Sequence, residues 1–212
     1  MWSVVRRTVY HLPPSGPTAA NYVTLVARLP DTITARLAPA LDDLRRVAPS
    51  HHYYAAANIH LTILNLDAIR RRWRTESDLI HAVRSVVASH SSFEITAVGL
   101  NVSPETVFTR LLPEDDTLSR LRQNIAALSP TARPWIIDPG QRLRRRIALA
   151  NAVRFSGVIT QSFAVAVSRW REASFGRGVI AELELVRTDR FLSTDGTEII
   201  ARMSLGRNDT TH

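Results

Sequence analysis

The sequence of 212 residues contains no cysteine and no lysine, and none of its apolar runs approaches the roughly 20 residues that span a bilayer. Without cysteine there is no disulfide framework and no thiolate ligand for a metal ion. The N-terminal stretch MWSVVRRTVYHLPPSG lacks the continuous apolar segment of a signal peptide. We therefore expect a cytoplasmic protein that does not enter a membrane.

The positive charge of the chain comes from arginine alone. All 27 basic residues are arginine, and against 19 acidic residues they give a formal net charge of +8. A guanidinium offers a planar fork of donors that suits phosphate oxygens. A positive chain attracts polyanions such as RNA, although part of the arginine excess is compositional, since alanine is abundant too. Charge thus favours an RNA or nucleotide partner without predicting a fold.

The stretch NIHLTILNL (58–66) has the alternation of a half-buried strand. Alternate side chains of a strand point to one face, so His60 and Thr62 share a face with Asn58 and Leu64. The opposite face carries three aliphatic side chains: Ile59, Leu61 and Ile63. The simplest interpretation is a strand packed on a core with a polar outer face. The same face also presents an imidazole beside a hydroxyl.

The other expected elements alternate along the chain. The expected strands are 22–28, 58–66, 93–100, 105–112, 147–155, 179–187 and 197–205. The expected helices are 30–47, 76–89, 113–128 and 160–173. Pro39 weakens the prediction for the early turns of the first helix, and the Pro-rich stretch 130–145 is expected to be irregular.

This order, strand–helix–strand–helix–strand, occurs twice and is followed by one more strand. It predicts an α+β protein whose two lobes are related by an approximate internal two-fold. We expect a single domain over 1–212, with lobes at approximately 20–100 and 101–206 and short tails at 1–19 and 207–212. The repeat lies in the pattern of elements, and it matches the strand of His60 with the strand at 147–155.

The motif HLT at 60–62, on a strand that follows a strand–helix unit, resembles the first signature of the two-histidine (2H) phosphoesterases. This superfamily includes the bacterial 2′,5′ RNA ligases and cyclic phosphodiesterases, and its members carry one His-apolar-Thr/Ser motif in each lobe. The resemblance covers most of residues 20–206 in element order. It implies a pseudo-symmetric fold with antiparallel sheets around a central cleft, in which His60 and Thr62 are catalytic.

The resemblance also implies a chemistry without metal or cofactor. Hydrolysis of a 2′,3′-cyclic phosphate needs a base to deprotonate water and an acid to protonate the leaving alkoxide. Two imidazoles can fill both roles. The hydroxyls donate hydrogen bonds to phosphoryl oxygens, which carry the charge of the transition state.

The second strand, IALANAVRF (147–155), contains no histidine. In one alignment Asn151 takes the histidine position and Val153 the threonine position. In the other, Arg154 matches an arginine that often follows the family motif, so Leu149 takes the histidine position and Asn151 the threonine position. In both, Leu149, Asn151 and Val153 are predicted to face the cleft. Asn151 can hold a phosphate oxygen but cannot exchange protons near neutral pH.

Other residues are candidates for the same cleft. His51 or His52 could lie at its rim as a substitute imidazole, and Tyr54 is a candidate for stacking on a base, although core packing is its commoner use. The arginine runs at 70–74 and 141–146 flank the two motif strands. Arg144 and Arg146 are the members of the second run that we predict to contact substrate phosphates.

Three functions follow from these observations. The first is a 2H-like enzyme with impaired cyclic phosphodiesterase or 2′,5′ RNA ligase-like activity on RNA ends or cyclic nucleotides. The second is a non-catalytic RNA- or nucleotide-binding protein on the same fold. The third, an unrelated α+β enzyme, has no supporting motif: the sequence shows no glycine-rich phosphate loop, nucleophile elbow or metal-spaced His/Asp cluster. We expect a monomer that binds a phosphodiester without a metal.

Overall fold

The computed structural model describes residues 22–128 and 148–206, apart from 71, 72, 190 and 194. The predicted tails at 1–19 and 207–212 lie outside these residues. The strands are β1 (Tyr22–Arg28), β2 (His52–Tyr53), β3 (His60–Asn65), β4 (Phe93–Val102), β5 (Thr106–Pro113), β6 (Ala148–Arg154), β7 (Ser174–Ile180), β8 (Glu182–Thr188) and β9 (Glu198–Ser204). The helices are α1 (Asp31–Val47), α2 (Asp67–Arg70), α3 (Glu76–Ala88), α4 (Thr117–Ala127) and α6 (Gln161–Arg169).

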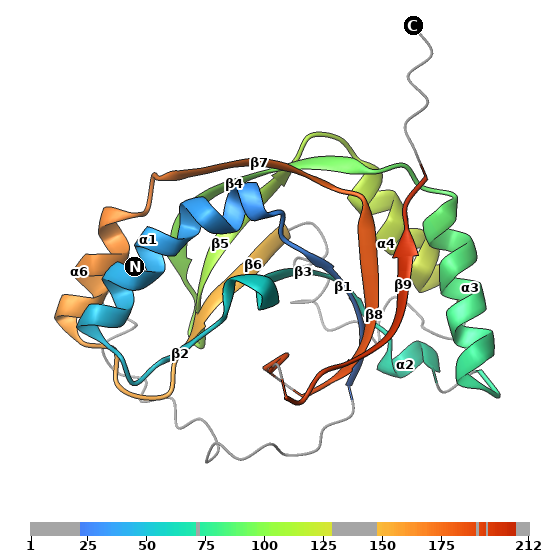
Figure 1. Cartoon of the computed structure of the whole chain (residues 1–212), viewed down its shortest axis with the longest axis horizontal. Coiled ribbons are helices and arrows are strands. Elements are labelled where there is room, and N and C mark those ends of the chain that lie inside the picture. Colours follow the sequence, from blue (N-terminus) through green and yellow to red (C-terminus); the bar gives the residue numbers. More distant parts are fainter. Residues whose placement is uncertain (1–21, 71–72, 129–147, 190, 194, 207–212) are drawn as a thin grey trace, which may run out of the picture.

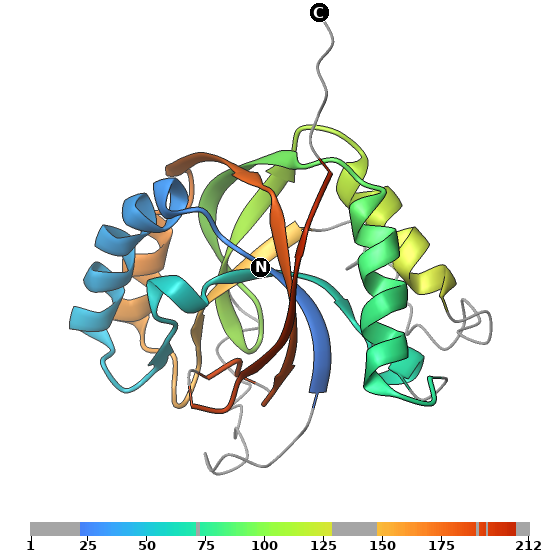
Figure 2. The same ribbon diagram turned by 45° about the vertical axis from the view of Figure 1, so that its right-hand side comes forward.

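The strands form one antiparallel sheet in the order β7-β4-β5-β6-β3-β1-β8-β9, and β2 pairs with one end of β6. The α+β class with antiparallel pairing is confirmed, and β3 and β6 are the two central strands, as expected. Four strands lie on either side of the β6–β3 junction. Helices α1 and α6 pack beside β4 and β7, whereas α3 and α4 pack beside β9 and β3, so each half of the sheet has its own helix pair (Figures 1 and 2).

The two halves of the sheet are each built from both halves of the chain. Strands β8 and β9, from the C-terminal half, extend the sheet from β1, while α1 packs against the half that contains β4 to β7. The sequence instead predicted lobes at 20–100 and 101–206. The difference arises because an element order shows which strands exist, whereas pairing between distant strands depends on the packing of the whole core.

Strand β7 was missed by the sequence prediction, which expected a single strand at 179–187. Its sequence SFGRGVI contains Gly176 and Gly178, and glycine weakens a strand prediction. A Cβ on Gly178 would lie 2.6 Å from Cγ of Pro30, so the start of α1 can approach β7 only where a side chain is absent. Glycine serves packing here and conceals the strand.

Helix α1 runs through Pro39 without a break. Pro39 removes one helix hydrogen bond, but it lies on the exposed side of the helix. The opposite side is buried against the core by Ile33, Leu37 and Leu44. Burial of this apolar face stabilises the helix despite the proline. None of the helices in the described part of the chain is long and apolar enough to cross a membrane.

Candidate functional site

Strand β3 presents the His60–Thr62 pair as the alternation predicted. Ile59, Leu61 and Ile63 are at most 2% exposed and belong to the core. Burial of these three aliphatic side chains holds the strand in place. His60 and Thr62 therefore point to the opposite face, and both line a pocket there.

A β-bulge at Ile63 changes the alternation beyond Thr62. In the pairing of β1 with β3, Val26 is opposite Thr62 and Leu25 is opposite Leu64, so Ile63 is the extra residue. Asn65 consequently lines the pocket, whereas Leu64 packs against the core. The prediction that Leu64 shares the face of His60 is wrong, because a period of two does not continue through a bulge.

Arg122 of α4 supports this bulge from behind. Its Nε donates to the carbonyl oxygen of Ile63 at 3.0 Å, and its Nη2 donates to that of Thr62 at 2.7 Å. The residue is 7% exposed. A buried cation is costly unless it is paired or hydrogen-bonded, and these strand carbonyls are among its acceptors. Sequence reasoning missed Arg122, since it lies on a helix distant from both motif strands in the chain.

Strand β6 contains a matching bulge. Val107 is opposite Val153 and Phe108 is opposite Asn151, so Ala152 is the extra residue. Asn151 and Arg154 thus both line the pocket, although they are three positions apart. The prediction that Val153 faces the cleft is wrong, because it lies past the bulge and is 0% exposed.

The two central strands are related by an approximate two-fold at the pair Leu61–Ala150. Both bulges lie two residues beyond this pair, at Ile63 and Ala152. Counting outward in the same way, Thr62 corresponds to Asn151. Two further pairs correspond: His60 with Leu149, and Asn65 with Arg154. The sequence left two alignments of the second motif open. The strand pairing matches the alignment in which Leu149 takes the histidine position.

The pocket has a volume of about 230 Å³ and gathers residues from both halves of the sheet. Its lining consists of Tyr22, Thr24, Tyr54, His60, Thr62, Asn65, Asn151, Arg154, Thr188, Asp189 and Leu192. The structure thus brings together four of the predicted site residues: Tyr54, His60, Thr62 and Asn151. Arg144 and Arg146 lie outside the described residues.

Burial keeps the imidazole of His60 neutral, and no described residue is bonded to its Nε2. Nδ1 lies 2.7 Å from the carbonyl oxygen of Asn58, which can only accept, so Nδ1 carries the proton and Nε2 the lone pair. Burial lowers the pKa of His60 from 6.5 to about 4. The hydrogen bond to Asn58 opposes this shift, and the charges of Arg28 and Arg154 add to it. At neutral pH, His60 can accept a proton but has no extra proton to give.

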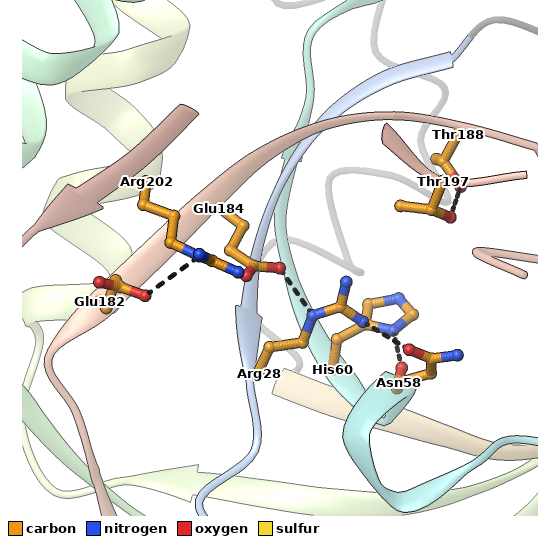
Figure 3. A network of polar contacts seen from close by, with 8 residues as sticks. All are labelled: Arg28, Asn58, His60, Glu182, Glu184, Thr188, Thr197 and Arg202. Atoms are coloured by element: carbon orange, nitrogen blue, oxygen red, sulfur yellow. Dashed lines mark hydrogen bonds and ion pairs between the residues drawn. The ribbon is translucent and has the colours of Figure 1, made fainter. Parts of the chain in front are cut away.

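A chain of ion pairs lies beside His60 (Figure 3). Nε of Arg28 donates to Oε2 of Glu184 at 2.8 Å, and Arg202 contacts Oε1 of the same carboxylate at 3.2 Å. Nη1 of Arg28 also lies 3.5 Å from Oδ1 of Asn58, whose carbonyl holds the imidazole. This network joins β8 and β1 to the residue that orients His60.

Asn151 is oriented by a neighbouring strand. The hydroxyl of Thr106 on β5 donates to Oδ1 of Asn151 at 3.1 Å. Asn151 lines the pocket, and because its oxygen is engaged by Thr106, its NH₂ group is the donor that remains for a ligand. Like the hydroxyl of Thr62, this group can donate a hydrogen bond to an anionic oxygen.

Tyr54 contributes its hydroxyl rather than a ring face. The ring is 3% exposed and packs edge-on against His52 and His60, with centroid distances of 5.1 and 6.1 Å. No open face therefore remains on which a base could stack. The hydroxyl oxygen accepts from Nε of Arg154 at 2.9 Å, and burial raises the pKa of Tyr54 while the charge of Arg154 opposes that rise.

Asp189 is the only carboxylate among the lining residues of the described pocket. Burial raises its pKa, but hydrogen bonds donated by Ser193 and Phe191 outweigh this effect and lower the pKa overall. The carboxylate is therefore ionised and already bonded at neutral pH. Its hydrogen bonds hold part of the connection between β8 and β9 in place beside the pocket.

The other histidines that the sequence proposed do not line the pocket. His51 is buried between Phe155 and Phe163, and Ser156 donates its backbone N–H to Nδ1. His52 is half-buried, and burial followed by the charge of Arg154 lowers its pKa, with Asp189 partly opposing this. Within the described residues, no three His, Cys, Asp or Glu side chains are grouped so as to hold a metal ion.

Of the two arginine runs, only part of the first is described. Arg70 pairs with Asp67 through Nε at 3.3 Å, within the short helix α2. This arginine is therefore part of a local helix pair and does not line the pocket. A phosphate-guiding role for the runs stays a prediction.

Comparisons with known proteins identify the fold. No family model matches the chain, and no curated protein matches it. TT0787 of Thermus thermophilus superposes with a TM-score of 0.65 at 17% identity, covering 88% of this chain and 99% of that one. Escherichia coli LigT complexed with phosphate gives a TM-score of 0.56 at 15% identity, covering 88% and 98%. A structure described as a phosphoesterase gives 0.54 at 13% identity, covering 88% and 99%.

The architecture is thus that of the LigT-like 2H phosphoesterases, an α+β fold with the pocket between two similar halves. LigT has also been crystallised with ATP, NADP⁺ and 3′-AMP. At identities of 13–17%, the likeness establishes the fold.

Proposed function

We propose that this protein is a metal-independent phosphoesterase that binds a nucleotide or RNA phosphodiester in the described pocket and hydrolyses 2′,3′-cyclic phosphates slowly. The observation that carries the proposal is the meeting of His60, Thr62 and Asn151 in one pocket on the two central strands. A base and donors for phosphoryl oxygens are the minimum for this reaction.

Each side chain has a role that its geometry supports. Nε2 of His60 accepts a proton from the attacking water, because Nδ1 is already protonated and held by Asn58. The hydroxyl of Thr62 and the amide of Asn151 donate to the non-bridging oxygens, and Arg154 adds positive charge. Such donors stabilise the transition state where its charge develops. LigT has been crystallised with phosphate and with 3′-AMP, which carry phosphoryl oxygens like those of the substrate proposed for this protein.

Turnover is proposed to be slow because the position related to His60 holds Leu149. An aliphatic side chain cannot transfer a proton, and a positioned acid or base contributes about 10²- to 10⁴-fold. The presence of leucine at residue 149 also supports the second candidate, a protein that binds RNA or nucleotides without turning them over. We further propose that the protein acts as a cytoplasmic monomer. In a 2′,5′ RNA ligase-like reaction at the same site, a 5′-hydroxyl would replace water as the nucleophile on the cyclic phosphate, and the 3′-oxygen would leave.

Hydrolysis of nucleoside 2′,3′-cyclic phosphates tests the first candidate. The wild type is expected to give slow turnover that is insensitive to EDTA, and His60→Ala should abolish it. His81→Ala is the matched control, because His81 is exposed on α3. Turnover that survives His60→Ala would place the chemistry elsewhere.

Binding separates the second candidate from the first. Affinity for 3′-AMP or a short RNA should fall between about 50 and 200 mM salt as counterions are released. Replacing Arg144, Arg145 and Arg146 with alanine should weaken binding and flatten this dependence. Salt-dependent binding without any hydrolysis would favour the non-catalytic protein.

A further inference from the structure

The proposed reaction leaves one proton unassigned. Cleavage of a cyclic phosphate releases an alkoxide, which needs a proton as the bond to phosphorus breaks. His60 is neutral and lines the pocket, and its role is to accept the proton of the attacking water. Leu149 at the related position cannot donate a proton. Without another donor in the pocket, this proton would have to come from water.

The titratable groups that line the described pocket are few. Asp189 is ionised and already accepts hydrogen bonds from Ser193 and Phe191, so it has no proton to give. The guanidinium of Arg154 does not release a proton in proteins. Tyr22, at the beginning of β1, is 39% exposed, and no described residue holds its hydroxyl in place. Tyr54 is the remaining donor.

Tyr54 is fixed from both ends. Its backbone N–H donates to the carbonyl of Ala152, the bulged residue of β6, at 3.1 Å. Its hydroxyl oxygen accepts from Nε of Arg154 at 2.9 Å. No described residue accepts the hydroxyl proton, which leaves it available to a molecule in the pocket. The ring lies edge-on to His60, with 6.1 Å between centroids, so base and phenol can address one phosphoryl group.

We propose that Tyr54 is the catalytic acid of this site and that Arg154 positions its hydroxyl, an inference that rests on the proposed phosphoesterase function. The oxygen of water bonds to phosphorus while its proton passes to Nε2 of His60. The bond from phosphorus to one ribose oxygen breaks, and that oxygen takes the proton of Tyr54. The product is a phosphomonoester, and the proton on His60 returns to the phenolate through solvent.

The pairing with Arg154 suits this step. A guanidinium that donates to the phenol oxygen stabilises the negative charge that appears on it as the proton leaves. Water is largely excluded from the ring, so this interaction is stronger than it would be at the surface. The hydroxyl stays protonated at neutral pH and is therefore ready to donate.

A comparison of leaving groups tests the role. Tyr54→Phe removes only the hydroxyl, and Tyr53→Phe is the matched control, since the hydroxyl of Tyr53 donates to the carbonyl of Ala48 outside the pocket. The substrates are a nucleoside 2′,3′-cyclic phosphate, whose alkoxide needs a proton, and a nucleoside p-nitrophenyl phosphate, whose phenolate leaves without one. Thermal unfolding verifies that each variant is folded.

Tyr54→Phe should lower kcat on the cyclic substrate by about 100-fold or more and change kcat on the p-nitrophenyl ester by less than about threefold. Tyr53→Phe should leave both unchanged. If Tyr54→Phe does not fold, fluorotyrosine at residue 54 keeps the size of the ring and should move the alkaline limb of the rate profile to lower pH. That limb also reflects the charges of Arg154 and Asp189 near the phenol. His52 and His60 face the ring as well, but both are neutral at alkaline pH.

Two negative results are distinguishable. Turnover that depends on His60 but is equally affected on both substrates, or unaffected, by Tyr54→Phe would overturn the role of Tyr54 alone. Absence of hydrolysis of both substrates by the wild type would overturn the proposed function itself.

Discussion

Arg28 and Glu184 form an ion pair of 2.8 Å between neighbouring strands, with side chains that are 25% and 8% exposed. Glu184 also holds Arg202, so one buried carboxylate bridges two guanidinium groups near the pocket (Figure 3). The pair is buried on the side of Glu184 and partly open on the side of Arg28. Its loss therefore leaves a half-buried positive charge without its partner.

Glu184→Gln should lower the free energy of unfolding by about 1–3 kcal/mol, less than for a fully buried pair because Arg28 is partly solvated. Urea unfolding at pH 7 measures this change. Glu182→Gln is the control: the side chain of Glu182 is 54% exposed and contacts Arg202 at 3.8 Å, so its loss should cost less than about 0.5 kcal/mol. Equal effects from the two substitutions would contradict the importance of the buried pair.

Burial of His60 should make stability depend on pH. Its pKa is about 4 in the folded protein and 6.5 when unfolded, so the unfolded chain binds more protons between these values. The free energy of unfolding therefore falls as the pH falls through this window. Between pH 7 and 4.5 the wild type should lose about 2 kcal/mol more than His60→Gln, measured by urea unfolding. An identical loss in both proteins would show that His60 is not buried as a neutral imidazole.

The same residue should set the acid limb of activity. Since the base acts unprotonated, kcat/KM for a cyclic phosphate should rise with pH and level off just above the pKa of about 4. The charge of Arg28 lowers this pKa, so Arg28→Gln should move the limb toward neutral pH. Arg154 also lowers the pKa of His60, but it lines the pocket, so it is kept unchanged in this comparison. A limb that stays in place in Arg28→Gln would exclude this electrostatic control.

The two-fold relation of the central strands predicts where a second histidine would work. Leu149→His should raise turnover of cyclic phosphates by at least about tenfold, because it supplies an acid at the position related to His60. The gain should be larger in the Tyr54→Phe background. Asn151→His should instead weaken activity by removing a phosphate donor. A gain from Asn151→His alone would favour the other alignment of the second strand.

Much of the site was predictable because it depends on short-range periodicity. Alternation placed His60 and Thr62 opposite a buried face, and the repeated element order matched this strand with the one that carries Asn151. The bulges at Ile63 and Ala152 were not predictable. No particular residue type marks the extra residue of a bulge, so the sequence gives no sign of it. The bulge at Ala152 places Arg154 at the pocket and Val153 in the core, whereas strict alternation predicted that Val153 faces the cleft.

The supporting residues escaped prediction for a different reason. Arg122 and Glu184 contact the site from elements far away in the chain, and nothing near them in sequence marks those contacts. Tyr54 was singled out for its ring, which is buried, whereas its hydroxyl is bonded to Arg154, another residue that lines the pocket. Long-range side-chain pairing depends on the packed fold, which periodicity does not describe.

The connection between β7 and β8 limits how the molecule can move. β7 is the edge strand of one half of the sheet and β8 belongs to the other, yet Ala181 alone joins them. The Cα atoms of Ile180 and Glu182 can be at most about 7 Å apart. This covalent strap prevents the halves from swinging open like a hinge at that edge. A nucleotide that binds as proposed would therefore reach His60 without the two halves opening at that edge.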